Sequence, residues 1–300
     1  MTAPTLESLD WLRPNLLGGT KLVGVMGWPV EHSVSPPMHN AAFRRLGLDW
    51  AYVPLAVRPE EMPEAVAGLR ALGFIGANAT VPHKRMLYDL VDELTPAAQA
   101  IGAANTLHIR PEGLLGHNTD AAGFDRALRE ANMPPEGRHA LVLGAGGAAR
   151  AVVYALASSS TTVTILNRTV AKAESLANAM ADAMSAGAIA SMEAGPLDRQ
   201  TLAHYSSRVN LVVNTTPLGM WPHVERSPWP ADLPFPREAG CYDLVYNPRR
   251  TQLLRQAEAA GAAISDGLGM LVHQGAEAFE LWTQQSAPVD VMRAACEAVL

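Results

Sequence analysis

The feature that most constrains the fold of this chain is a short apolar run that leads into a glycine-rich turn. Residues 140–143 (ALVL) are followed by GAGGAA at 144–149, and residues 148–158 are rich in alanine without glycine or proline. This pattern predicts a buried strand, a tight turn and a helix that begins near Gly147. The spacing G-x-G-x-x-G/A, closed here by Ala149, is typical of turns that bind the pyrophosphate of a dinucleotide.

The residue types of this turn suit a phosphate group. Without side chains at Gly144 and Gly146, a pyrophosphate can approach the backbone, and the helix N-terminus offers unpaired N–H groups and a partial positive charge. Many strand-to-helix turns are glycine-rich for steric reasons alone, but here the required strand and helix are both predicted. The candidate cofactor-binding residues of the turn are Gly144, Ala145, Gly146, Gly147 and Ala148.

The end of the next predicted strand, 161–166 (TTVTIL), indicates which dinucleotide binds. Enzymes that prefer NAD commonly have Asp or Glu here, which binds the ribose 2′-hydroxyl. This chain instead has Asn167, Arg168 and Thr169, with Lys172 one helical turn further on. Because arginine can bind a 2′-phosphate through two hydrogen bonds, the sequence predicts NADP. The alternative is a solvated basic face on an exposed helix.

Strands and helices alternate along the chain, which predicts an α/β fold built from βαβ units with largely parallel sheets. The predicted strands are 21–26, 50–57, 161–166, 209–213, 240–245 and 262–265, with a hairpin over 107–117. The predicted helices include 37–46, 60–72, 121–131, 170–184, 251–260, 271–283 and 289–299. We expect less order after residue 184 and a surface loop over 223–237, which is rich in proline and tryptophan.

Composition and charge exclude several classes of partner. The 300-residue chain is long enough for two domains, and its 48% hydrophobic and 17% charged residues are typical of a globular protein. A net charge of −6 with scattered Lys and Arg predicts no nucleic-acid partner. Two cysteines without metal-ligand spacing, no apolar run of membrane-span length and no signal-peptide pattern predict a cytoplasmic protein without a metal site or a membrane partner.

Polar residues cluster where predicted strands end, and ligands of parallel α/β sheets bind beyond these carboxyl ends. The segment 76–84 (GANATVPHK) places Asn78, Thr80 and Lys84 close together in the chain. Lys84 opens a predicted helix, where the helix dipole opposes a cation, so a functional role is favoured over that of an exposed surface lysine.

Hydroxyl and carboxylate side chains mark two predicted helix starts. Ser35 fits the N-cap position, with Pro36 as the first helical residue, and a capping serine needs no further function. Ser33 lies two residues earlier, and the two hydroxyls together can bind a small carboxylate. Asp120 heads the predicted helix 121–131, where for this residue taken alone an N-cap role is favoured over a functional one.

The chain resembles the shikimate dehydrogenase family in nine segments that occur in the family's order. These are GWPVEHSVSPPMHN (27–40), GANATVPHK (76–84), GAANT (102–106), GHNTDAAGF (116–124), GAGGAARA (144–151), NRT (167–169), NTTPLGM (214–220), DLVYNP (243–248) and DGLGMLVHQG (266–275). The departures are Trp28 and Ala79, in place of the commoner Asn and Val, and His117, in place of a frequent Tyr.

This resemblance implies reversible reduction of 3-dehydroshikimate to shikimate with NADPH, a step in the biosynthesis of aromatic amino acids. It implies two α/β domains separated by a cleft. A substrate-binding domain with a mainly parallel sheet covers 1–119 and is completed by 266–300, and a Rossmann-type NADP-binding domain covers 120–265. The implied partner is a small-molecule substrate, and the chain is expected to be a monomer or a homodimer.

The family's functional residues map onto matching positions of this sequence. The implied ligands of the substrate carboxylate are Ser33, Ser35, Thr80 and Tyr246, and those of the ring hydroxyls are Asn78, Asn105, Asp120 and Gln274. Lys84 is the implied proton donor, with Asp120 beside it to keep it charged. Three residues in turns that follow predicted strands complete the candidate cofactor site: Thr215, Gly267 and Met270.

Two alternatives to this function stay open. A quinate or dual shikimate/quinate dehydrogenase accepts an extra ring hydroxyl and often uses NAD; the basic segment 167–169 argues against NAD but does not bear on quinate. A sensor that binds shikimate-like ligands without turnover has no need of Lys84 or Asp120, yet both are present and no DNA-binding segment is recognisable.

Overall fold

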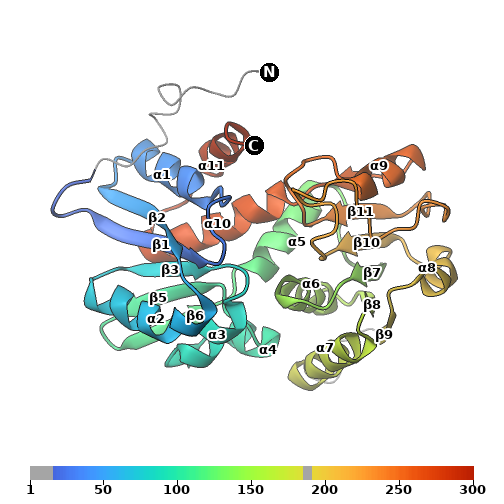
Figure 1. Cartoon of the computed structure of the whole chain (residues 1–300), viewed down its shortest axis with the longest axis horizontal. Coiled ribbons are helices and arrows are strands. Elements are labelled where there is room, and N and C mark those ends of the chain that lie inside the picture. Colours follow the sequence, from blue (N-terminus) through green and yellow to red (C-terminus); the bar gives the residue numbers. More distant parts are fainter. Residues whose placement is uncertain (1–15, 185–190) are drawn as a thin grey trace. The chain divides into compact units, whose positions relative to one another are not determined.

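The computed structural model describes residues 16–184 and 191–300 (Figure 1). The chain forms two compact units: the first unit is the chain up to Thr119 together with Val272–Leu300, and the second unit is Asp120–Leu271. Each unit contains a sheet with helices, which confirms the predicted α/β class. The return to the first unit, expected at residue 266, occurs at Val272, within helix α10 (Leu268–Thr283).

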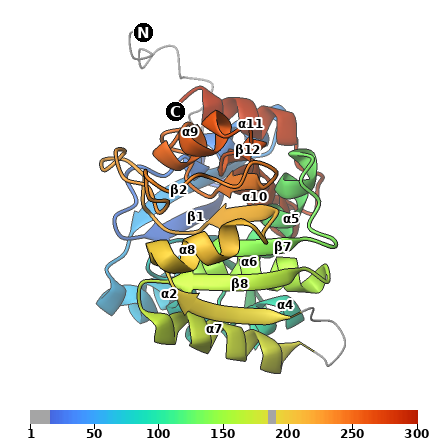
Figure 2. The same cartoon turned by 90° about the vertical axis from the view of Figure 1, so that its right-hand side faces the viewer.

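The second unit contains a six-stranded parallel sheet in the order β12-β11-β10-β7-β8-β9. Its strands are β7 (His139–Leu143), β8 (Thr162–Asn167), β9 (Met192–Pro196), β10 (Leu211–Asn214), β11 (Gly240–Asp243) and β12 (Ile264–Ser265). Figure 2 shows β7, β8 and β9 side by side. The second unit begins with β7 in the middle of the sheet, continues with β8 and β9 on one side, and then adds β10, β11 and β12 on the other side. This is the Rossmann order. Ligands of such sheets bind where the order reverses, here between β7 and β10.

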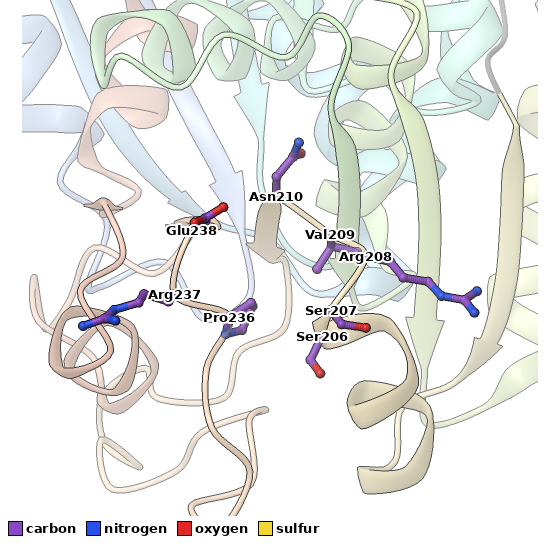
Figure 3. A pocket seen from close by; sticks show the side chains of 8 residues that line it. All are labelled: Ser206, Ser207, Arg208, Val209, Asn210, Pro236, Arg237 and Glu238. Carbon is purple, nitrogen blue, oxygen red and sulfur yellow. The ribbon is translucent and has the colours of Figure 1, made fainter.

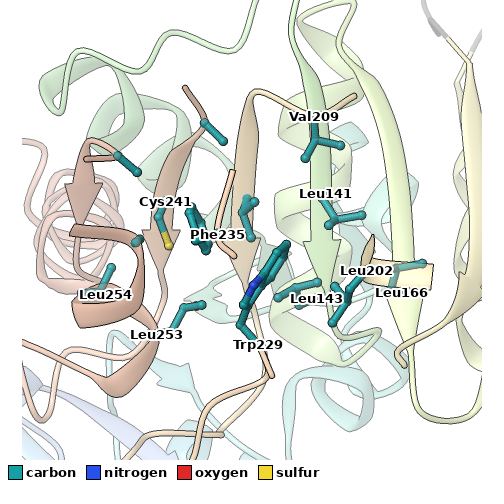
Figure 4. Close-up of a cluster of buried hydrophobic side chains, with 14 residues drawn as sticks. Leu141, Leu143, Leu166, Leu202, Val209, Trp229, Phe235, Cys241, Leu253 and Leu254 are labelled. Atoms are coloured by element: carbon teal, nitrogen blue, oxygen red, sulfur yellow. The ribbon is translucent and has the colours of Figure 1, made fainter. Parts of the chain in front are cut away.

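Alternation along the strands gives this sheet two apolar faces. Leu141 and Leu143 of β7 join the cluster of buried side chains in Figure 4, so Ala140 and Val142 face the opposite side. The helices of the second unit are α5 (Asp120–Glu130), α6 (Gly147–Ser158), α7 (Val170–Ala183), α8 (Arg199–Ser206) and α9 (Gln252–Ala259). Buried alanines on α6 let it pack closely against β7 and β8.

The sequence predicts a surface loop over 223–237, and this prediction is wrong for the two aromatic side chains of the segment, which are buried. Trp229 and Phe235 are buried in the cluster of Figure 4, with ring centroids 4.9 Å apart. The Trp229 indole N–H donates to the Leu233 carbonyl at 2.9 Å, and Gln256 of α9 donates to the Trp229 carbonyl at 3.1 Å. This segment contains no helix and lies in the connection between β10 and β11. Burial of a large apolar side chain stabilises a fold by about 1.5–3 kcal/mol.

The expectation of less order after residue 184 is also wrong where the structure describes that stretch. Residues 185–190 lie outside the described part, but β9 and α8 follow directly. The β9 sequence, MEAGP, has low strand propensity, and its pairing with β8 overrides that preference. Helix α8 is capped by Asp198, whose carboxylate accepts the Thr201 N–H at 2.8 Å.

The first unit contains a six-stranded sheet in the order β2-β1-β3-β5-β6-β4. Its strands are β1 (Lys21–Gly27), β2 (Trp50–Ala56), β3 (Gly76–Ala79), β4 (Glu93–Leu94), β5 (Thr106–Arg110) and β6 (Gly113–His117). Strand β1 pairs in parallel with β2 and β3, and β6 pairs in parallel with β4, whereas β5 runs antiparallel to its neighbours. The mainly parallel sheet and the hairpin are therefore confirmed.

Helices accompany the sheet of the first unit. They are α1 (Ser35–Arg45), α2 (Met62–Ala71), which follows the short 3-10 helix η2 (Pro59–Glu61), α3 (Lys84–Leu90), α4 (Pro96–Ile101), most of α10, and α11 (Val289–Glu297). Helices α1 and α11 lie side by side (Figure 1). Across residues 16–184 and 191–300, no helix is both long enough and apolar enough to cross a membrane.

Candidate functional site

The glycine-rich turn joins β7 to α6 where the strand order of the second sheet reverses. Gly144 has φ = +112°, which favours glycine, and its N–H donates to the Leu166 carbonyl at 2.7 Å. A Cβ atom on Gly144 would lie 2.5 Å from Thr215 Oγ1, whereas one on Gly146, the N-cap of α6, would meet open space. Gly144 therefore lets the turn approach Thr215, and Gly146 leaves the helix N-terminus accessible to an anion.

Two alanine substitutions in this turn are expected to separate stability from cofactor binding. Gly144→Ala should lower the free energy of unfolding by about 1–3 kcal/mol, because it combines a strained φ with a steric clash. Gly146→Ala should leave stability within about 0.5 kcal/mol but weaken NADP binding roughly tenfold, because its methyl group would occupy the open side of the helix N-terminus. Urea unfolding and calorimetric titration measure the two effects; equal losses of stability would contradict the distinction.

Thr215 lies directly beside the glycine-rich turn. Its hydroxyl and its backbone N–H both donate to the Leu143 carbonyl, at 2.8 and 2.9 Å. Two further candidates, Gly267 and Met270, pack within the same unit: a Cβ on Gly267 would lie 2.0 Å from the Leu244 carbonyl oxygen, and the Met270 N–H donates to the Tyr242 hydroxyl at 3.2 Å. The structure thus shows a packing role for Gly267, and contact with a cofactor stays a prediction for both.

The basic segment at the end of β8 is exposed, and a hydrogen bond within the segment fixes its turn. Arg168 and Thr169 are exposed, and Lys172 is exposed on the first turn of α7. The Asn167 side-chain amide donates to the Thr169 carbonyl at 2.9 Å, which fixes the turn between β8 and α7. An exposed arginine at this strand end is free of the steric limits of a buried site and can reach a phosphate.

Ser33 and Ser35 lie at the start of α1, but Ser35 does not cap this helix as predicted. Ser35 is the first residue of α1, the N-cap is Val34, and no side chain caps the helix, so the predicted N-cap role of Ser35 is wrong. Ser33 Oγ instead accepts the Ser35 N–H at 3.3 Å. Burial raises the pKa of Tyr52, and the nearby Ser35 side chain opposes this shift.

Tyr52, which was not predicted as a site residue, hydrogen-bonds one of the predicted hydroxyl-binding residues. Its hydroxyl donates to Asn78 Oδ1 at 2.7 Å. The Asn40 side chain bonds the Tyr52 backbone N–H and carbonyl at 2.8 and 2.9 Å, so β2 is held against α1. A tyrosine in an apolar strand is expected to pack in a core, and no pattern in the sequence distinguishes this one.

Asn78, Asn105 and Gln274 lie in one continuous polar network within the first unit. The Asn78 amide donates to Thr106 Oγ1 at 2.9 Å and to the Asn105 carbonyl at 3.2 Å. Asn105 Nδ2 donates to Thr119 Oγ1 at 2.9 Å and to Gln274 Oε1 at 3.4 Å. The last contact is long for a hydrogen bond, so it is the weakest link in an otherwise satisfied network.

Lys84 is the first residue of α3 and is half-buried. The preceding residue, His83, is fully buried, with Nε2 2.8 Å from the Val57 carbonyl oxygen. Because a carbonyl can only accept, Nε2 carries the proton, and burial lowers the His83 pKa. The His83 backbone N–H donates to the Thr80 carbonyl at 2.8 Å. The turn between Thr80 and Lys84 is therefore held by both the backbone and the side chain of His83.

Asp120 is the first residue of α5 and is 4% exposed. A carboxylate at this position is stabilised by the positive end of the helix dipole. Asp120 belongs to the second unit and Lys84 to the first, so their proposed pairing stays a prediction. Tyr246, also in the second unit, follows β11 and is half-buried.

Two histidines near these loops are uncharged packing groups. His39 is fully buried and stacks on the Tyr52 ring with centroids 4.2 Å apart, and burial lowers its pKa to about 3. For His117, burial, followed by the charges of His108 and Arg110, lowers the pKa to about 4. Among the described residues, no group of three or more His, Cys, Asp or Glu side chains could hold a metal ion.

A separate hollow of about 400 Å³ lies in the second unit, near the amino ends of β10 and β11 (Figure 3). Its lining includes Arg208 and Arg237, whose guanidinium groups extend away from the hollow in opposite directions. Ligands of Rossmann sheets bind at the carboxyl ends of strands, which is the other end of β10. The hollow is therefore distinct from the candidate cofactor site.

Comparison with known proteins matches the chain to three family models. Residues 25–107 match the shikimate dehydrogenase substrate binding domain, 127–196 match shikimate/quinate 5-dehydrogenase, and 267–297 match the shikimate 5′-dehydrogenase C-terminal domain. The NADP(+)-dependent shikimate dehydrogenase of Desulforamulus reducens is 48% identical over 279 residues, which cover 92% of this chain and 94% of the relative. The chain belongs to the shikimate dehydrogenase family.

Other shikimate dehydrogenases support the same assignment over nearly the whole chain. The enzyme of Methanothermobacter thermautotrophicus, also named as NADP(+)-dependent, is 45% identical over 95% of this chain and 99% of its own length. The structure of the Thermus thermophilus enzyme in complex with NADP(H) and shikimate has a TM-score of 0.84 and 38% identity, covering 94% of this chain and all of that one. The Rossmann-type sheet is therefore shared with a shikimate dehydrogenase of known structure.

Proposed function

We propose that this protein catalyses the reversible, NADP-dependent reduction of 3-dehydroshikimate to shikimate. The observation that carries the proposal is the 48% identity over almost the whole chain to an NADP(+)-dependent shikimate dehydrogenase. The geometry supports it, because one chain combines a Rossmann-ordered sheet with a buried network of hydroxyl and amide groups. A cytoplasmic location, and a monomer or homodimer, stay predictions.

The network in the first unit suits a polyhydroxylated ring that carries a carboxylate. Ser33 and Ser35 supply hydroxyls for the carboxylate, with Thr80 and Tyr246 as further donors. A ring hydroxyl can replace the long contact between Asn105 and Gln274, accepting a hydrogen bond from one amide and donating to the other. Asn78 can accept from a second hydroxyl, because its carbonyl oxygen has one donor, Tyr52, and a second lone pair. Most of the network is already formed, so little ordering accompanies binding.

The second unit suits a dinucleotide. Residues 144–148 are proposed to bind the pyrophosphate through the N-terminus of α6, and residues 167–169 with Lys172 to bind the 2′-phosphate. Thr215, Gly267 and Met270 are proposed to contact the nicotinamide half, since the turn after β10 adjoins the glycine-rich turn. When bound, NADPH supplies the hydride.

Lys84 is proposed as the proton donor and Asp120 as its partner. Hydride transfer to a carbonyl carbon generates an alkoxide, which is stabilised by a nearby cation and neutralised by a proton. A protonated lysine ammonium supplies both, and its proton passes to the carbonyl oxygen as the C–H bond forms. In the reverse direction the neutral amine accepts the hydroxyl proton. A carboxylate at Asp120 favours the charged form of the lysine.

A nicotinamide absorbance assay tests the proposed function. Shikimate and quinate are each supplied with NADP⁺ and with NAD⁺, and the fastest reduction is expected with shikimate and NADP⁺. A dual shikimate/quinate enzyme would reduce NADP⁺ with both substrates at similar kcat/KM. Binding of shikimate without any reduction of either cofactor would instead support a sensor and contradict the proposed activity.

A further inference from the structure

A buried carboxylate in the second unit connects the two turns that carry candidate ligand residues. Asp243 is the last residue of β11, is fully buried, and lies opposite Asn214, the last residue of β10. Asp243 Oδ1 accepts from the Asn214 side-chain amide at 2.8 Å and from the Val245 N–H at 3.1 Å. Its other oxygen, Oδ2, accepts the Thr251 hydroxyl at 2.6 Å. Asp243 thus touches both turns and the N-cap of α9.

The Asn214 side chain, which is bonded to Asp243, also hydrogen-bonds the turn after β10. While its amide donates to Asp243, its Oδ1 accepts the Thr216 N–H at 3.0 Å and the Thr216 hydroxyl at 2.7 Å. Thr215, the candidate cofactor residue, lies between these two anchored residues. On the other side, Val245 precedes Tyr246, a candidate ligand of the substrate carboxylate.

We propose that Asp243 is a positioning residue that, as a carboxylate, holds the turns after β10 and β11 in the arrangement that binds NADP. This inference rests on the proposed function in that NADP is taken as the ligand of the second unit. Three donors point at Asp243, so a protonated carboxyl group cannot satisfy all of them. A proton on Oδ1 opposes the Asn214 and Val245 donors. A proton on Oδ2 reverses the bond to Thr251, whose oxygen then accepts from both Asp243 and the Leu254 N–H, and the Thr251 hydroxyl hydrogen loses Asp243 as its acceptor.

The protonation state of Asp243 changes within an accessible pH range. Burial is the largest of the effects that together raise the pKa of Asp243 to about 6: the three hydrogen bonds oppose the rise, and the charge of Asp266 adds to it. Asp266 is ion-paired with Arg249. Cys241, the titratable neighbour on β11, has a pKa raised well above its usual value by burial and by Asp243, so the thiol stays neutral in this range.

The direction of the Asp243 pKa shift distinguishes an effect on NADP binding from an effect on the stability of the fold. A carboxyl group whose pKa is higher in the folded state stabilises the fold most below its unfolded pKa, and this contribution is lost as the pH rises through about 6. Acidification from pH 7 to pH 5 therefore favours the folded state through Asp243 but removes the carboxylate that holds the turns. Weaker NADP binding at pH 5 without loss of stability is the signature of a positioning role.

The test measures the dissociation constant of NADP⁺ for the full chain, without substrate, by calorimetry between about pH 5 and pH 8. The Asp243→Asn variant keeps an oxygen toward Asn214 and Val245 but cannot ionise, and it should bind NADP⁺ about 3–10-fold more weakly than wild type at pH 8. The 2′-phosphate of NADP⁺ itself titrates near pH 6, so the wild-type profile must be compared with that of the variant. The additional weakening below pH 7 should be present in wild type and absent in Asp243→Asn.

A second pair of variants keeps the test informative if Asp243→Asn does not fold. Thr251→Val removes the hydrogen bond that lowers the Asp243 pKa, so the pH below which NADP⁺ binding weakens should rise. Thr251→Ser retains the hydroxyl and should leave this pH unchanged. Identical pH profiles in wild type and in both valine and asparagine variants would overturn the inference alone. Absence of NADP⁺ binding by the wild-type chain would overturn the proposed function together with it.

Discussion

Replacement of Lys84 by alanine is expected to lower kcat by about 10²–10⁴-fold while the dissociation constant for shikimate changes only a few-fold. The ammonium group acts on charge that develops during hydride transfer, so its removal affects the transition state far more than the bound substrate. The shikimate contacts proposed for Ser33, Ser35, Asn78 and Asn105 are retained in the variant. Steady-state kinetics and equilibrium binding of shikimate measure the two quantities separately.

Arg85 provides a matched control for this substitution. It is the next residue of α3, it is exposed, and its guanidinium is paired with Asp89 at 3.3 Å. Arg85→Ala removes a cation from the same helix turn, and turnover should stay within about threefold of wild type, because exposed ion pairs contribute little. Turnover of Lys84→Ala equal to that of Arg85→Ala would remove Lys84 from the proposed mechanism.

Replacement of Arg168 by alanine is expected to raise the KM for NADPH by about 10–100-fold and to leave the KM for NADH within about twofold. A charge-assisted hydrogen bond contributes about 1.5–3 kcal/mol, and each 1.4 kcal/mol corresponds to a factor of ten. NADH lacks the 2′-phosphate, so it loses nothing when the guanidinium is removed. Initial rates at saturating 3-dehydroshikimate, with each cofactor varied in turn, give both constants.

Arg199→Ala controls for the change in net charge that accompanies Arg168→Ala. Arg199 is an exposed arginine at the start of α8, paired with Asp232 at 2.7 Å. Its removal changes the charge of the second unit by the same amount, yet the KM for NADPH should stay within about twofold of wild type. An equal rise in KM for both cofactors in Arg168→Ala would show that Arg168 acts on something other than the 2′-phosphate.

The elements predicted from sequence pattern are those whose stability is local. The strand at 140–143, the turn at 144–146 and the helix from Gly147 were predicted because apolar residues, glycine and alanine each favour one backbone state. Strand β9 and the burial of Trp229 were not predicted, since β9 depends on pairing with β8 and Trp229 on the cluster around it. In both cases, contacts with distant residues override what the local sequence favours.

The candidate site shows the same division. Lys84, Asp120 and the residues at strand ends were identified because polar and charged groups stand out next to apolar strands and glycine turns. Tyr52 and Asp243 were not identified as site residues, since their roles depend on partners elsewhere in the chain, such as Asn78 and Asn214. A buried hydrogen-bond network joins several strands, and no spacing in one segment records it.

The sequence by itself determined that the chain is an α/β protein, and it predicted a dinucleotide-binding turn and a basic residue that binds a 2′-phosphate. It could do so because these features lie within single strand-turn-helix segments. Only the tertiary structure decided that Gly144 serves the approach to Thr215, that Tyr52 hydrogen-bonds Asn78, and that Asp243 links two turns. Each of these depends on strand order and register, which bring together segments that are far apart in the chain.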